Sequence, residues 1–204
     1  MVEDVGTRAR APRADARRNR DLILGTAERH FAEHGVGGSL DAIAKQAGVG
    51  AGTLYRHFPT REALLAALLA GRDEELIARR ERLRTASVST AEALDGWLGA
   101  VVMWAGAFEG LPGPLREATK TSASPLATTC EGFVTTTAEF LEAAQRDGLA
   151  RSDIRPRDLF LAALATSWVQ GAALADDASA AALSALTRTG WAAPEPPRPA
   201  RPRD

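Results

Sequence analysis

The 204-residue sequence is poor in cysteine, lysine and aromatic residues. Phenylalanine, tryptophan and tyrosine together make up only 5% of the chain. Its single cysteine, Cys130, excludes an internal disulfide framework and a CxxC metal or redox pair, and it suits a reducing cytoplasm. Scarce aromatic residues together with abundant alanine and leucine favour helices over sheets. The N-terminus has no apolar h-region, so we expect no signal peptide and a cytoplasmic protein.

The rest of the composition is typical of a globular helical protein. Apolar residues make up 45% of the chain and charged residues 25%, which is enough to bury a core in one or two small domains. No segment alternates polar and apolar residues between hairpin turns, as strands would, and almost every segment has helical spacing. The uncharged stretch 159–175 approaches the length of a membrane span, but Thr166, Ser167 and Gln170 indicate a buried or interface helix instead.

The net charge of −1 is unevenly distributed along the chain. Residues 8–61 carry ten basic and five acidic side chains, whereas residues 62–204 carry fifteen basic and nineteen acidic side chains. This basic N-terminal quarter predicts a polyanionic partner for the N-terminal part alone. We expect four regions: a flexible basic arm over 1–13, a helical head over 14–60, a helical body over 61–193 and a disordered Pro/Arg-rich tail over 194–204.

Apolar spacing and helix-breaking residues divide the chain into nine predicted helices. In the first, Ile23, Ala27 and Phe31 recur every four residues as a buried stripe, and Gly35 ends the helix. The predicted helical ranges are 15–34, 40–47, 51–57, 61–84, 90–108, 114–120, 125–147, 156–175 and 178–191.

The segment 39–58 meets the requirements of a helix-turn-helix unit. Ser39 is a good N-cap for its first helix. Ala44 is small enough for the two helices to cross closely, Gly48 can adopt a positive φ in the turn, and Leu54 anchors the second helix in a core. Taken alone, such a pair of short helices is a moderate signal.

The wider sequence resembles the TetR family of bacterial transcriptional regulators over about residues 15–70. The resemblance is carried by ILGTAERHF at 23–31, SLDAIA at 39–44 and GVGAGTLYRHF at 48–58, followed by Arg61 and Glu62. It implies an all-α dimer with a three-helix DNA-binding head and a C-terminal helical domain for ligand binding and dimerisation. The two last long helices, over 156–175 and 178–191, would pair across the dimer.

The resemblance also implies which residues contact DNA, with the helix over 51–57 lying in the major groove. Arg56 can reach a guanine edge and is expected to carry most of the direct base readout, while Ala51 offers a methyl group to thymine. The arginines at 13, 17 and 18 can reach adjacent phosphates. The candidate DNA-binding residues are Ser39, Lys45, Gly50, Ala51, Gly52, Thr53, Tyr55, Arg56, His57 and Arg61.

The body is expected to hold a small-molecule effector. The candidate pocket wall consists of Trp104, Phe108, Phe133, Thr137, Phe140 and Trp168. Large rings with few polar groups predict a bulky, mostly apolar effector, to which Glu109 and Glu131 can add charge. The same aromatic residues can instead form a solid core. Likewise, the two last helices can close the core of one subunit instead of joining two.

Together with the basic N-terminal quarter, the resemblance to TetR regulators implies a ligand-responsive, dimeric repressor that binds a palindromic operator and is released from it by the effector. The first alternative is an activator or weakly specific DNA-binding protein with no ligand pocket. The second is a metal-dependent hydrolase, because His30 to His34 match the H-x-x-E-H pattern of zinc peptidases. Phe31 supplies the buried stripe of that helix and no third ligand is evident, so we expect neither enzymatic activity nor a metal or other cofactor.

Overall fold

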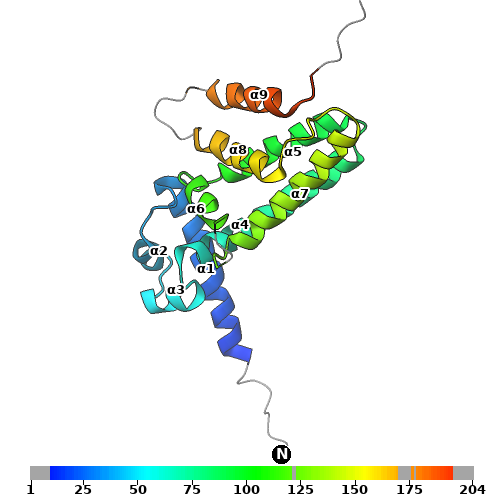
Figure 1. The fold of residues 1–204 in the computed structure, drawn as a ribbon. Helices are drawn as coiled ribbons and strands as arrows, with labels where there is room; N and C mark the ends of the chain where they lie inside the picture. The colour runs from blue at the N-terminus through cyan, green and yellow to red at the C-terminus, as the bar shows by residue number, and fades with distance from the viewer. Residues whose placement is uncertain (1–9, 121–122, 170–175, 177, 195–204) are drawn as a thin grey trace, which may run out of the picture.

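The structure is a computed structural model that describes residues 10–120, 123–169, 176 and 178–194. Every extended regular element among these residues is a helix, which confirms the all-α prediction. Figure 1 shows α1, α2 and α3 gathered as a head, with α9 on the far side of the body. The helices are α1 (Arg10–His34), α2 (Leu40–Gln46), α3 (Ala51–His57), α4 (Arg61–Thr85), α5 (Thr90–Ala105), α6 (Pro112–Ala118), α7 (Ala127–Arg146), α8 (Pro156–Val169) and α9 (Ser179–Trp191).

The head folds around the apolar stripe predicted for α1. Ile23, Ala27 and Phe31 are fully buried, and so are Ile43 of α2 and Leu54 of α3. Burying each of the larger side chains contributes about 1.5–3 kcal/mol before the entropy of ordering is subtracted. Helix α1 packs against both short helices, so this core fixes how α3 is presented.

Turns and caps separate the short helices as the sequence predicts. Gly35 and Gly48 both have a φ of +68°, a conformation that side chains other than glycine rarely adopt. Ser39 caps α2 and Thr60 caps α4, because each hydroxyl accepts a hydrogen bond from the backbone N–H three residues later. The capping residue of α3 is Gly50, which has no side chain to accept one.

Helix α4 joins the head to the body, since it packs against α1 at one end and against α5 further along. Helix α5 is the centre of the body and also packs against α7 and α8. Its start is fixed by a capping box between Ser89 and Glu92. Helix α9 packs on α8 and is tied to α5 by Arg188, whose Nη1 donates to Asp95 Oδ2 at 2.7 Å.

A second junction between head and body lies at the loop after α5. The backbone N–H of Val36 donates to the carbonyl of Glu109 at 2.8 Å. The rings of Phe31 and Phe108 meet edge to face with 6.2 Å between their centroids. Together with α4, this junction means that movement of the body can change the position of the head.

Several boundaries differ from the prediction. Helix α1 begins at Arg10, so the predicted flexible arm over 1–13 is wrong for its last four residues; Pro12 is tolerated because the N–H groups of a first turn have no helical partner. The helix predicted over 90–108 ends at Ala105. The predicted extension of α8 to residue 175 and the predicted tail from 195 lie outside the described residues.

The apolar helix that approaches spanning length is a helix of the body. Helix α8 buries Leu159, Phe160, Ala163 and Leu164 against its neighbours, which confirms the prediction of a buried helix for its described part. Among the residues that the structure describes, no helix combines the length and the apolar character needed to span a bilayer.

Candidate nucleic-acid interface

Helix α3 presents one face to the core and the other to solvent. Leu54 and Phe58 face inward and are 0% and 3% exposed, as predicted, whereas Tyr55 is 43% exposed. Thr53 and His57 are half-buried. The remaining residues predicted to contact DNA here are exposed: Gly50, Ala51, Gly52 and Arg56. A phenol, a guanidinium, a hydroxyl and an imidazole therefore share the outer part of a helix that contains no acidic residue.

The start of α3 has almost no side chain. A Cβ atom added at Gly50 or Gly52 would meet nothing within 4 Å, so the fold itself leaves this end open. Ala51, between the two glycines, adds only a methyl group. The backbone of residues 50–52 is therefore accessible to a closely approaching surface. Short residues at this point suit contact with a nucleic-acid backbone or a thymine methyl group.

The guanidinium of Arg56 lies along α3 in the free protein. Its Nε donates to the carbonyl of Gly52 at 3.2 Å, and its Nη2 donates to Oγ1 of Thr53 at 3.0 Å. Both contacts are exposed and lie within one helical turn, so they cost little to exchange for other acceptors. Arg56 and Thr53 therefore form a coupled polar pair at the centre of the exposed face.

Helix α2 brings two further predicted residues to the same side of the fold. Lys45 is exposed in the last turn of α2, where its ammonium group is favourable for the helix dipole. The hydroxyl of Ser39 accepts from the N–H of Ala42 at 3.2 Å. Ser39 is therefore a helix cap, and its side chain is exposed to solvent.

Arg61, another of the candidate DNA-binding residues, is held by contacts within the fold. Its Nη1 donates to the carbonyls of Val36 and Gly38, each at 2.6 Å, and its guanidinium carbon lies 5.9 Å from the centroid of the Phe31 ring. The side chain is half-buried and holds the α1–α2 loop to the start of α4. The structure therefore gives Arg61 a role in positioning α2.

Sequence reasoning missed Arg20, which the fold brings to the end of α3. Its guanidinium lies 5.5 Å from the centroid of Phe58, the residue that ends α3. The two residues are 38 positions apart in the sequence, and no periodic pattern signals the contact. Of the other arginines on α1, Arg17 is exposed, whereas Arg18 forms an exposed ion pair with Asp15 at 2.7 Å.

The two histidines of the H-x-x-E-H pattern stack on one another. The ring centroids of His30 and His34 are 4.4 Å apart, and Nδ1 of His34 bonds to the carbonyl of His30. His30 is buried, and neither of its ring nitrogens has a hydrogen-bond partner among the described residues. Within the described part of the chain, no three His, Cys, Asp or Glu side chains are grouped to hold a metal ion.

Comparison with known proteins identifies the family. Residues 23–68 match the family model of bacterial regulatory proteins of the tetR family, and residues 89–193 match the C-terminal domain of SbtR-like transcriptional regulators. A TetR transcriptional regulator from Streptomyces coelicolor is 33% identical, with a TM-score of 0.56, over 85% of this chain and 98% of that one. The chain belongs to the TetR family.

Two further relatives show how the similarity is distributed. An HTH-type transcriptional regulator of Staphylococcus aureus is 47% identical over 53 residues, which are 26% of this chain and 29% of that protein. A ketosteroid transcriptional regulator of Mycobacterium tuberculosis shares the fold, with a TM-score of 0.54 and 22% identity over 85% of this chain and 94% of that one. Membership of the TetR family makes the protein a transcriptional regulator that binds DNA through its helix-turn-helix.

Four residues of the predicted effector wall pack with Trp97 in the body of this TetR-family protein. Phe133 contacts Trp104 edge to face at 4.6 Å between centroids, and Phe140 stacks on Trp97 at 5.8 Å. Thr137 is fully buried and accepts from Nε1 of Trp97 at 2.9 Å. These residues form a core in which Trp97 takes the central place, and Trp104 is the one that also borders an open cavity.

The remaining residues of that predicted wall lie elsewhere. Phe108 packs against α1 at the head–body junction, and Trp168 is 62% exposed on α8. Glu109 contributes its carbonyl to the same junction, with its side chain exposed. Glu131 borders a separate cavity of about 600 Å³ beside Cys130. A single pocket enclosed by all of the predicted residues is therefore wrong.

Cys130 is a buried free thiol. Its Sγ lies 3.7 Å from the carbonyl of Leu115 on α6. Burial, together with the nearby carboxylate of Glu131, raises the pKa of the Cys130 thiol to about 11. The thiolate that reacts with electrophiles and oxidants is therefore scarce at neutral pH.

The predicted dimer helices carry both buried and exposed apolar residues. Trp191 of α9 is 1% exposed within the chain, so it belongs to the core of one subunit. Leu186 of α9 is 67% exposed and Trp168 of α8 is 62% exposed. Large apolar side chains left in solvent on neighbouring helices are what a partner surface would cover.

Proposed function

We propose that this TetR-family regulator is a dimeric, effector-controlled repressor whose two heads bind a palindromic operator. The observation that carries the proposal is the exposed face of α3, where Thr53, Tyr55, Arg56 and His57 surround a nearly bare helix start. One such face is too small for tight, specific binding, so two copies related by a two-fold axis are needed. The half-sites would then lie about one helical turn apart, roughly 34–36 Å.

The dimer is proposed to form through α8 and α9. Trp168 and Leu186 are the exposed apolar residues that support this choice, and Leu183 is half-buried beside them on α9. A two-fold interface uses the same patch on both subunits, so these residues would meet their own copies or each other. The heads lie on the other side of the body and stay free for DNA (Figure 1).

Control by an effector is proposed to act through α4. A ligand that binds the body more tightly in one arrangement of the heads shifts the population toward that arrangement. Since α4 packs against both α1 and α5, and Val36 is bonded to Glu109, the head follows the body. Release of the operator requires that the favoured head spacing no longer matches two successive major grooves.

The test is selection of bound duplexes from a random library at near-physiological salt, followed by sequencing. The proposal predicts an enriched palindrome with half-sites about one turn apart. Binding without an enriched motif would favour the alternative, a weakly specific DNA-binding protein. That protein would show little difference in affinity between duplexes and a salt dependence set by its phosphate contacts.

A further inference from the structure

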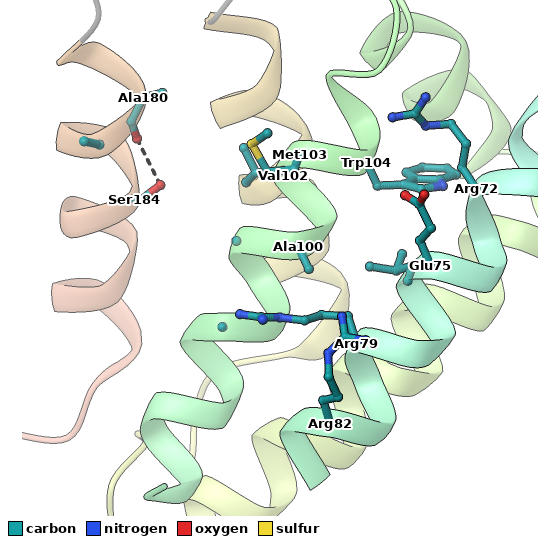
Figure 2. A pocket seen from close by; sticks show the side chains of 14 residues that line it. Arg72, Glu75, Arg79, Arg82, Ala100, Val102, Met103, Trp104, Ala180 and Ser184 are labelled. Carbon is teal, nitrogen blue, oxygen red and sulfur yellow. Dashed lines mark hydrogen bonds between the residues drawn. The ribbon is translucent and has the colours of Figure 1, made fainter. Parts of the chain in front are cut away.

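Residues of helices α4, α5 and α9 line an open groove of about 710 Å³ on the body (Figure 2). One side of the groove is formed by α4, whose arginines point into it, and the floor by α5. Short residues of α9, including Ala180 and Ser184, form the other side. The groove is separate from the aromatic core around Trp97, and Trp104 is the residue that borders both.

Three guanidinium groups lie along this groove without a protein partner. Arg72, Arg79 and Arg82 are seven and three residues apart, so they share one face of α4. Among the described residues, none of these three guanidinium groups donates a hydrogen bond or joins an ion pair, although the backbone carbonyl of Arg82 accepts one from Thr85. In contrast, Arg80 and Arg84 of the same helix both pair with Glu81.

The charge of the groove is therefore positive. Glu75 is the one acidic residue among those that line it. Figure 2 shows Arg72 near Trp104, and Arg79 reaching from α4 across to α5. The Nη2 atom of Arg79 lies 3.9 Å from the position that a Cβ on Gly96 would take. Arginine donors arranged in this way match the geometry of a carboxylate, phosphate or sulfonate group.

The floor of the groove is apolar and has room for a ligand. Met103 is 69% exposed there, and the ring of Trp104 closes the end near Arg72. A Cβ atom at Gly99 would meet nothing within 4 Å, so this part of α5 faces open space. Figure 2 shows the thioether of Met103 on the α9 side of α5 and the indole of Trp104 on the α4 side, and both are soft surfaces for a flat or aliphatic group.

Trp104 connects the groove to the helix that positions the head. Its Nε1 donates to Oδ1 of Asp73 on α4 at 3.2 Å. Burial raises the pKa of the Asp73 carboxyl, and the bond from Trp104 opposes that rise. A ligand that moves the indole would disturb this bond and with it the packing of α4, which begins four residues after α3 ends.

We propose that the groove binds a small organic anion, with its acidic group on Arg79 and Arg82 and its apolar part extending along α5 toward Met103 and Trp104, where Arg72 lies. This inference rests on the proposed function, since it assigns the effector site and its chemistry. The predicted effector was bulky and mostly apolar; the arginine row adds an acidic group to that description. Its position against α4 gives the ligand a direct route to the head.

Two fluorescent probes that differ by one acidic group test the site. 1-Anilinonaphthalene-8-sulfonate carries a sulfonate, and N-phenyl-1-naphthylamine has the same rings without it. We expect the sulfonate probe to bind the purified dimer more tightly. The Arg79→Gln/Arg82→Gln variant should lower its affinity roughly tenfold or more, because two charge-assisted contacts are lost, and leave the neutral probe within about twofold.

Matched variants separate the groove from general effects of charge. Arg80→Gln/Arg116→Gln removes two positive charges outside the groove, where each arginine pairs with an adjacent glutamate. It should leave binding of both probes within about twofold, because surface ion pairs contribute little. Gly99→Leu places a side chain in the open part of the groove and should weaken binding of both probes. Circular dichroism and thermal unfolding of each variant check that the fold is kept.

The outcomes distinguish this inference from the proposed function. Equal binding of the two probes, or equal loss in both arginine double variants, would overturn the anion site, whether or not the protein binds a palindromic operator. If the groove variants change the dimer dissociation constant in sedimentation but not probe binding, the groove is covered by a second copy and the proposal is wrong. Probe binding that follows the arginines would support the site even if no operator is selected.

Discussion

Helix α3 buries a single side chain, Leu54, whereas α5 buries half of its sixteen residues. In the head, the candidate DNA-binding face therefore consists of the α3 residues that do not pack into the core. In the body, most of the large rings are used by the core, and the open groove is lined mainly by glycine, alanine and arginine, with Trp104 at one end. The candidate DNA-binding face of the head is therefore marked by exposed polar side chains, whereas the groove of the body is marked by arginines without a partner among the described residues.

The largest expected effect concerns two tryptophans that the comparison separates. Trp97→Ala should lower the free energy of unfolding by about 3–5 kcal/mol, because it empties a buried site and removes the bond to Thr137. Trp168→Ala should cost less than about 0.5 kcal/mol in one subunit, because its ring is exposed. Denaturant unfolding at low protein concentration measures both, and similar losses for the two variants would contradict the division between core and surface.

The next prediction concerns base readout by the head. Arg56→Ala should remove about 1–3 kcal/mol of discrimination between a selected operator and its altered half-site, while changing non-specific binding less. Lys45→Ala is the matched control, because an exposed lysine in the last turn of α2 is expected to contact phosphate. It should weaken binding to all duplexes alike and reduce the salt dependence. Uniform loss in Arg56→Ala would make Arg56 a phosphate contact.

A glycine pair tests how tightly the α1–α2 loop is packed. A Cβ at Gly38 would lie 2.7 Å from Cδ2 of the buried His30 ring, whereas a Cβ at Gly37 would meet nothing within 4 Å. Gly38→Ala should therefore destabilise the protein by about 1–3 kcal/mol. Gly37→Ala should change stability by less than about 0.5 kcal/mol. Equal thermal shifts for the two variants would show that the loop can adjust around His30.

The half-buried Asp73 gives a smaller, pH-dependent effect. Because burial raises its pKa in the folded state, ionisation is easier in the unfolded chain, and its contribution to stability falls as pH rises through that interval. Asp73→Asn keeps an acceptor for Trp104 and removes the ionisation. The difference in unfolding free energy, variant minus wild type, should rise between about pH 3 and 7 by less than about 1 kcal/mol. A difference that falls with pH would contradict this assignment.

The smallest expected effect is at Cys130. Since burial raises the pKa of its thiol to about 11, a thiol reagent at pH 7.5 should modify the folded protein far more slowly than the unfolded chain. Thiol titration with and without denaturant measures this ratio. Similar rates in both conditions would mean that the cavity beside Cys130 admits reagent and that this part of the body is open.

The head could be predicted largely from the sequence, because its pattern is local. The spacing of Ile23, Ala27 and Phe31, the positive φ of Gly48 and the burial of Leu54 all follow from helix periodicity and turn chemistry. Arg61 shows the limit of this reasoning. Its two carbonyl partners lie 23 and 25 residues earlier in the chain, so only the folded loop reveals that it positions α2.

The body could be predicted only as a set of helices. Trp104, Phe133 and Phe140 are predicted to surround a ligand. In the fold, α5 and α7 pack together so that Phe133 contacts both Trp104 and Trp97, and Phe140 stacks on Trp97. The arginine row lies on a helix whose spacing is visible in the sequence. Arg80 pairs with the adjacent Glu81, whereas the Arg79 guanidinium has no partner among the described residues. The sequence could not show this difference at Arg79, because it depends on which residues α5 and α9 bring nearby.

The central claim is that two copies of α3 occupy successive major grooves of one operator. Hydroxyl-radical footprinting of the selected duplex with the wild-type dimer tests it directly. The account predicts two protected segments related by a two-fold axis, with centres about one helical turn apart, and loss of both when Arg56→Ala replaces the wild type at the same concentration. A single protected segment, or protection spread evenly along the duplex, would contradict it.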